Sequence, residues 1–228
     1  MSPKAVAAFC IGLAGLAAGT GALSEINSEQ GSDPVLWVMV SRFGIVAVFA
    51  AFGLYAASES RMRGSIILTA DDPRIAFQDL LNYGILPGFM IGLINYLFFF
   101  FNRYSPRIAP RIRGMEDVYD SFLVSFDASI FEEVVYRLFI MSCLMFLIQH
   151  LYRGIKSVWP VLVSVLPRAM ALVISSLLFA VAHNVYGFTG AFCGGLMLGF
   201  IFMKSGIESA IAAHFVANFL FFSVSYLS

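Results

Sequence analysis

Hydrophobic positions along the chain form seven long runs that are separated by short polar segments. The runs cover roughly residues 5–23, 35–57, 80–101, 122–148, 161–182, 188–203 and 208–226. A bilayer core about 30 Å thick requires about 20 apolar residues in a helix to cross it. The pattern therefore predicts an all-α fold, a polytopic transmembrane helix bundle of seven to eight helices.

The fifth run leaves the number of helices open. Pro160 and Pro167 lie within residues 158–182, and a proline inside a helix removes a backbone hydrogen bond. Either one helix or a short helix followed by a longer one fits this run. Only a few residues around Tyr186 and Gly187 join it to the sixth run, so we expect the two helices to be antiparallel neighbours.

Composition supports a membrane protein and excludes several other classes. Of the 228 residues, 60% are hydrophobic and 12% are charged, against about 45–50% and about 25% in soluble domains. The net charge is zero, which leaves no electrostatic basis for a nucleic-acid partner. Cys10, Cys143 and Cys193 lie in apolar runs without zinc-site spacing, which argues against a disulfide framework.

Glycines are frequent in the sixth run. Small residues at helical spacing let two helices approach closely in a membrane. We therefore expect this run to pack tightly against a neighbour through Gly187, Gly190, Gly194, Gly195 and Gly199.

The runs predict one integral membrane domain over residues 1–228. Residues 1–115 contain N-terminal transmembrane helices and loops, and residues 116–228 contain the helices that carry the polar motifs described below. We expect an integral protein of the cell (inner) membrane, with lipid as a partner.

The distribution of basic residues favours a cytoplasmic N-terminus. Lys4 precedes the first run, whereas the following loop, residues 24–34, has acidic residues and no Lys or Arg. The next loop is basic, as this orientation requires, but so is the loop after it, and two basic loops cannot both be cytoplasmic when they flank one span. The first of these loops contains Arg61, Arg63 and Arg74, and the second contains Arg103, Arg107, Arg111 and Arg113.

Several polar side chains interrupt the apolar runs. An ionisable residue at membrane depth costs at least about 2.5–3.5 kcal/mol, and such residues face a bundle interior or a wet cavity and favour a functional role. The residues concerned are Arg42, Asp127, Glu132, Glu133, Arg137, His183 and His214, with the amide Asn218.

The segment EEVVYR, residues 132–137, predicts two carboxylates with different roles. Residues four apart share a helix face, so Glu133 and Arg137 can pair, whereas the adjacent Glu132 points elsewhere. Glu132 is therefore free for chemistry. The alternative is a purely structural ion pair beside a protonated glutamate.

Two later helices carry further polar positions. In FAVAH, residues 179–183, Phe179 and His183 share a face, although a lone histidine near the end of a span is often only interfacial. In HFVAN, residues 214–218, His214 and Asn218 share a face and can both donate hydrogen bonds. The alternative for this second pair is a hydrogen-bonded clamp between helices.

Together these side chains form a set suited to hydrolysis. A glutamate assisted by a histidine can take a proton from water. A histidine and an amide can donate hydrogen bonds to the oxyanion of a tetrahedral intermediate.

The motifs of three known types of intramembrane protease are missing. No HExxH begins at His150, His183 or His214, which removes the zincin type. The nearest segment to the GxSG of rhomboid-type serine proteases is FMKSG, residues 202–206, where Phe202 replaces the first glycine. Tyr119 and Asp120 form the YD of the aspartyl type, but no GxGD follows.

The set EEVVYR, FAVAH and HFVAN resembles the CPBP family, the CAAX-protease and bacteriocin-processing (Abi) membrane proteins. The family pattern is EExxxR, FxxxH and HxxxN or HxxxD on successive late helices, and the chain matches every position between about residues 120 and 226. The resemblance implies an intramembrane endopeptidase similar to type II CAAX prenyl proteases. It implies that Glu132 with His183 activates water and that His214 with Asn218 stabilises the oxyanion. Glu133, Arg137 and Phe179 would hold the site.

The resemblance leaves cofactor and substrate open. Glu132, His183 and His214 could instead bind zinc with one open position, as the older description of the family as metalloproteases implies. We favour a metal-free mechanism because the His–Asn stripe suits hydrogen-bond donation. The substrate class is a membrane-associated, possibly lipidated or membrane-anchored, protein or peptide. The alternatives are a non-catalytic immunity or scaffold protein and a small transporter, although duplicated halves are missing from the sequence.

Overall fold

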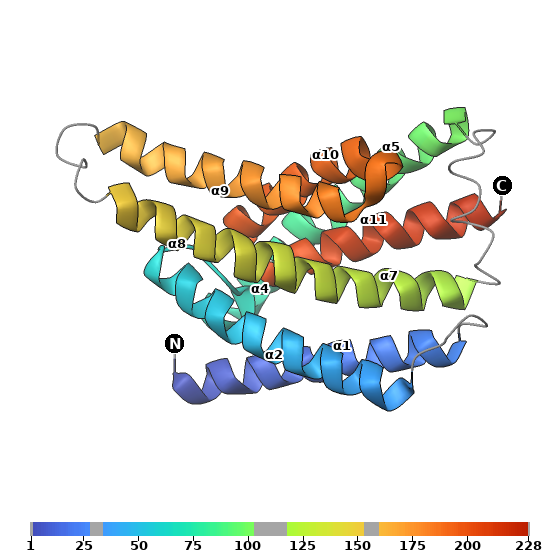
Figure 1. Ribbon diagram of the computed structural model, residues 1–228, viewed down its shortest axis with the longest axis horizontal. Helices are drawn as coiled ribbons and strands as arrows, with labels where there is room; N and C mark the ends of the chain where they lie inside the picture. The colour runs from blue at the N-terminus through green and yellow to red at the C-terminus, as the bar shows by residue number, and fades with distance from the viewer. Residues whose placement is uncertain (1, 28–33, 103–117, 153–159, 228) are drawn as a thin grey trace.

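The computed structural model describes residues 2–27, 34–102, 118–152 and 160–227, and all regular elements there are helices (Figure 1). Seven stretches of these residues are long and apolar enough to cross a membrane, which confirms the predicted all-α membrane bundle. The elements are α1 (Pro3–Asn27), α2 (Val35–Glu59), α3 (Ile66–Thr69), α4 (Pro73–Asp79), η1 (Leu80–Ile85), α5 (Leu86–Asn102), α7 (Val118–Glu133), η2 (Val134–Met141), α8 (Ser142–Leu151), α9 (Pro160–Ala182), α10 (Asn184–Ser205) and α11 (Ile207–Leu227).

Two of the crossings are composite helices that contain a π-helical segment. In the third crossing η1 joins α4 to α5, and in the fourth η2 joins α7 to α8. Segments of π-helix are rare and are frequent at functional sites. The second of them begins directly after Glu133, within the EEVVYR segment.

The fifth and sixth runs differ in detail from their prediction. The fifth is one helix, α9, with a buried Pro167 inside it. The break before α10 is at His183, so the predicted connection around Tyr186 and Gly187 was placed too late. Hydropathy could not locate this break because the turn consists of a single residue. The two helices pack against each other as neighbours.

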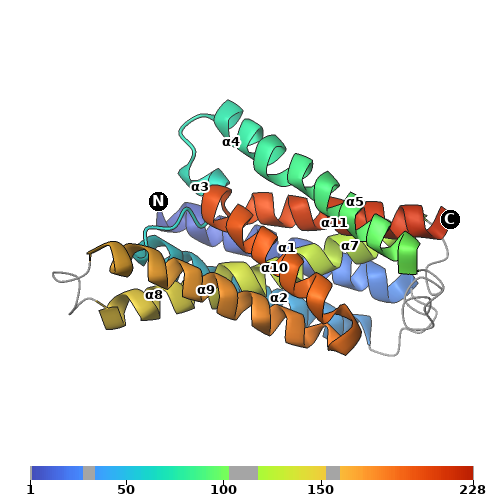
Figure 2. The same ribbon diagram turned by 90° about the horizontal axis from the view of Figure 1, so that it is seen from above.

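The bundle is built around the fourth crossing. The hairpin of α1 and α2 covers one side of α7 and η2, and α11 packs on α7 from another side (Figure 1). The α4–η1–α5 crossing lies over α11 (Figure 2). Fully buried side chains of the fourth crossing form the centre of the core, namely Ile130, Val134, Leu138, Met141 and Met145.

Glycines bring the helix backbones close at two of these interfaces. A Cβ atom on Gly88 of α5 would lie 2.8 Å from the carbonyl oxygen of Ala213 on α11. One on Gly53 of α2 would lie 2.3 Å from the carbonyl oxygen of Leu138 in η2. Both separations are far below van der Waals contact, so only glycine permits these approaches.

The close packing predicted for the sixth run is found at part of its glycines. Gly195 lies against Ser176 of α9, and Gly199 lies against Leu172 of the same helix. Gly190 and Gly194 face open space, and the surroundings of Gly187 lie outside the described side chains. Sequence spacing could not separate the glycines that face a partner from those that do not.

Polar contacts fix the start of the last crossing. The carboxylate of Glu208 accepts hydrogen bonds from the Ser65 hydroxyl and from the backbone N–H groups of Ile66 and Ile67. Arg63 forms an ion pair with Asp79 nearby in the chain. The basic residues 103, 107, 111 and 113, which weaken the predicted orientation, lie outside the described residues.

Candidate active site

Three helix segments far apart in the sequence bring the predicted polar residues together. Glu132 and Glu133 end α7, His183 is the non-helical residue between α9 and α10, and His214 lies in the middle of α11. The helix break at His183 frees this residue from regular helical geometry. The side chains meet inside the bundle, at the depth of the spanning helices.

Glu132 lies between the two histidines. Its Oε2 atom is 3.7 Å from Nε2 of His183 and 3.7 Å from Nε2 of His214. These distances exceed a hydrogen bond and are typical of polar groups that a water molecule bridges. Glu132 and His183 keep about a quarter of their side chains exposed, 26% and 24%, so the pair is accessible.

The other nitrogen of each imidazole is committed elsewhere. Nδ1 of His183 lies 2.8 Å from the carbonyl oxygen of Phe179, which can only accept, so Nδ1–H donates this bond. Nδ1 of His214 lies 2.9 Å from Oε1 of Glu133. Both Nε2 atoms are therefore left to face Glu132.

Glu133 forms the predicted pair with Arg137. Its Oε2 atom lies 3.4 Å from Nε of Arg137, and both side chains are fully buried. The prediction from helical spacing is confirmed. The second partner of Glu133, His214, is 81 residues further along the chain, and no local pattern could reveal this contact.

Phe179 contacts most of these groups through its ring. The guanidinium of Arg137 lies 4.8 Å from the ring centroid, the separation of a cation–π contact. The imidazole centroids of His183 and His214 lie 4.3 and 6.0 Å away. Phe179 thus separates the buried ion pair from the accessible Glu132.

Asn218 stands apart from this group. It lies one turn after His214 on α11 and is half-buried. Among the described residues no hydrogen bond joins it to His214 or to another member of the site. The structure therefore brings together six of the seven predicted residues, Glu132, Glu133, Arg137, Phe179, His183 and His214.

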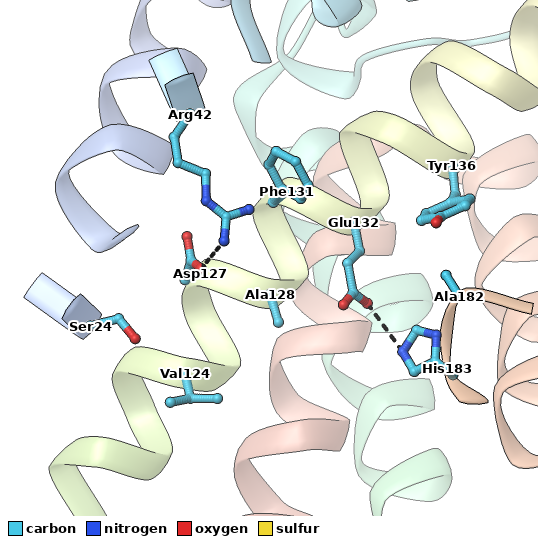
Figure 3. Close-up of a pocket in the computed structure, with 10 residues that line it drawn as sticks. All are labelled: Ser24, Arg42, Val124, Asp127, Ala128, Phe131, Glu132, Tyr136, Ala182 and His183. Carbon is cyan, nitrogen blue, oxygen red and sulfur yellow. Dashed lines mark hydrogen bonds and ion pairs between the residues drawn. The ribbon is translucent and has the colours of Figure 1, made fainter. Parts of the chain in front are cut away.

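A pocket of about 440 Å³ opens onto Glu132 and His183 (Figure 3). Its lining also includes an ion pair between Arg42 of α2 and Asp127 of α7, with Nη2 and Oδ2 3.0 Å apart. The Arg42 guanidinium lies over the Phe131 ring at 4.0 Å. The two charges left over in the sequence thus neutralise each other.

The alternative of a zinc site has suitable donor types but not the spacing. Two ligands of a tetrahedral zinc ion, each about 2.0–2.1 Å from the metal, lie about 3.3 Å from each other. Glu132 is 3.7 Å from each histidine. No group of three or more His, Cys, Asp and Glu residues within the described ranges is arranged to hold a metal ion.

Comparison with known proteins then identifies the family. Residues 115–220 match the family model described as Rce1-like, type II CAAX prenyl endopeptidase Rce1-like. Through this region, the chain belongs to the CAAX protease family. No curated protein and no solved structure matched the chain. The predicted resemblance is confirmed, and all three motifs of the CAAX protease lie within the matched range.

Two features of this CAAX protease gave no usable signal in the sequence. Tyr136 lines the pocket beside Glu132 and His183, yet in EEVVYR it is only a spacer between charged positions. Ser24 reaches the same pocket from the end of α1, outside the matched region. An aromatic residue four positions after an exposed glutamate was the one available hint, because such residues share a helix face.

Proposed function

We propose that this CAAX protease hydrolyses a peptide bond of a membrane-associated or lipidated protein or peptide, with Glu132 as the general base. The observation that carries the proposal is the position of Glu132 Oε2 between the Nε2 atoms of two histidines, at the wall of an open pocket. A carboxylate in this position can take a proton from a bound water while the imidazoles hold that water.

Each remaining residue has a distinct part in the proposed reaction. His183 orients the attacking water together with Glu132. His214, held by Glu133, donates from Nε2 to the oxyanion when it carries a second proton, and Asn218 assists it. Glu133, Arg137 and Phe179 hold the two histidines in place. The reaction as proposed needs no metal ion.

Cleavage of a synthetic prenylated CAAX peptide by the purified protein in liposomes tests the base. We expect Glu132→Gln to lower the rate by on the order of 10²–10⁴-fold, the range of general-base catalysis. The matched control is Glu59→Gln, which changes an exposed glutamate at the end of α2 and should keep the full rate. Equal rates for Glu132→Gln and the unmodified protein would refute the assignment.

Metal analysis of the same active preparation tests the metal-free mechanism. We expect full activity in a chelator and less than one equivalent of zinc per chain. Activity that is lost in chelator and restored by zinc would instead support a metal held by Glu132, His183 and His214. Proton flux without cleavage in these liposomes would support a transporter.

A further inference from the structure

The pocket lacks the oxyanion donors that the proposed reaction assigns. Hydrolysis needs hydrogen-bond donors directed at the oxygen that becomes negative, and each such donor is a large contribution. The pocket wall contains Glu132 and His183, but His214 and Asn218 are not among its lining residues. A substrate carbonyl that lies in this pocket therefore meets other donors first.

Tyr136 is a donor at the required end of the pocket. It follows Glu132 by four residues at the start of η2, and both line the pocket. Its ring packs edge-to-face on Phe179, with centroids 5.2 Å apart, and Phe179 in turn contacts His183. Figure 3 shows Tyr136, Glu132 and His183 on one side of the pocket and Arg42 with Asp127 on the other.

The hydroxyl of Tyr136 has no hydrogen-bond partner among the described residues. A tyrosine that packs its ring in an apolar interior usually finds a partner for its O–H group. The ring here is fixed by Phe179, while the O–H group is left available to whatever occupies the pocket.

We propose that Tyr136 is a further catalytic residue, whose hydroxyl donates a hydrogen bond to the oxyanion of the tetrahedral intermediate. This inference rests on the proposed function and adds a donor that its motifs do not include. The other donors in the pocket wall serve less well. Arg42 is held by Asp127 and Phe131, and Ser24 comes from the end of α1 beside that pair (Figure 3).

The step balances without a cofactor. Glu132 takes one proton from water as the water oxygen bonds to the carbonyl carbon, and the C=O π electrons move to the oxygen. The Tyr136 O–H group donates to this oxyanion and keeps its proton. When the C–N bond breaks, the amine nitrogen takes the proton from Glu132, which leaves a carboxylic acid, an amine and the original carboxylate.

The variant Tyr136→Phe removes only the hydroxyl and keeps the ring contact with Phe179. We expect kcat for the prenylated CAAX peptide to fall by on the order of 10²-fold, as for other single oxyanion donors, with KM unchanged. The matched control is Tyr55→Phe, which removes a hydroxyl from an exposed ring on α2 outside the pocket. It should leave both constants unchanged.

A phosphonate analogue of the peptide, in which a P–O⁻ group replaces the oxyanion, separates catalysis from structure. We expect Tyr136→Phe to bind the phosphonate on the order of 10²-fold more weakly, by the same loss of one donor, and the uncleaved peptide equally well. An unchanged kcat would overturn the proposal, as would an equal loss of affinity for both ligands. Failure of Glu132→Gln to reduce cleavage would refute the proposed base separately, because phosphonate binding does not require proton abstraction.

Discussion

Glu132 and Glu133 are adjacent in the chain and have opposite surroundings. Glu132 is a quarter exposed and faces two Nε2 atoms, whereas Glu133 is fully buried between Arg137 and His214. Adjacent residues diverge by about 100° around a helix, so one reaches the pocket and the other the core. The same chemical group is thus available as a base at one position and as a structural anchor at the next.

This difference predicts opposite effects of the same substitution. Glu133→Ala leaves the buried Arg137 without its counter-ion, and we expect it to lower the free energy of unfolding by about 3–5 kcal/mol. Glu132→Ala removes a partly exposed carboxylate and should change stability little. Thermal or denaturant unfolding in detergent measures both, and Glu132→Ala serves as the matched control. A Glu133→Ala protein as stable as the unmodified one would contradict the role of the buried pair.

At the scale of residues, local pairs were predictable and distant ones were not. The Glu133–Arg137 pair follows from helical spacing alone. The contact of His214 with Glu133 and the pairing of Arg42 with Asp127 join helices far apart in the chain, so they depend on packing that the sequence does not display. Asn218 shows the converse, since a correct helical neighbour of His214 is not enough to form a contact.

The helix that carries His214 is positioned by glycines of another helix. Gly84, Gly88 and Gly92 recur every four residues along η1 and α5, and each lies against α11. Gly92 would place a Cβ atom 3.0 Å from the Ala217 carbonyl oxygen, and Gly88 is closer still to Ala213. This interface therefore sets how far His214 extends towards Glu132.

Enlarging one of these glycines should disturb the site from a distance. Gly88→Ala forces α11 away, and we expect a stability loss of about 1–3 kcal/mol from overpacking together with reduced cleavage. Gly190→Ala is the control, because nothing lies within 4 Å of its added methyl group. Unfolding and peptide cleavage are measured on both. Normal cleavage by Gly88→Ala would show that α11 tolerates the shift.

The Arg42–Asp127 ion pair connects α2 to α7, so it joins the N-terminal hairpin to the helix of the EEVVYR segment. Arg42→Gln or Asp127→Asn alone leaves one charge unpaired within a span. We expect each single change to be more destabilising than the double change, with a coupling energy of about 0.5–3 kcal/mol. A double-mutant cycle of unfolding free energies measures it. Additive effects would show that the two helices are held by other contacts.

At the scale of elements, hydropathy located the spans but not their internal irregularities. It missed both π-helical segments, and it placed the break between the fifth and sixth runs after His183. The reason is physical: a π-turn or a single non-helical residue changes the direction of side chains without changing how apolar the segment is. The family-specific motif, by contrast, was visible because it consists of polar residues in apolar runs.

The whole molecule has an odd number of crossings. The seven stretches place the start of α1 and the end of α11 at opposite ends of the bundle (Figure 1). We expect tags at the two termini to lie on opposite sides of the membrane, with the N-terminal tag cytoplasmic because Lys4 precedes the first span. Protease protection of each tag in sealed vesicles of one orientation measures this. Both tags on the same side would contradict seven crossings.

The π-helical segment η2 acts as a change of phase within one continuous rod. Before it, Glu132 faces the pocket, and after it, Phe139 stacks on Phe49 of α2 with ring centroids 4.3 Å apart. Deleting a single residue here would restore ordinary winding and rotate everything downstream by about 100°. The length of this short stretch is therefore as constrained as its composition, and an alignment gap within it would mark a protein whose two halves no longer address the same centre.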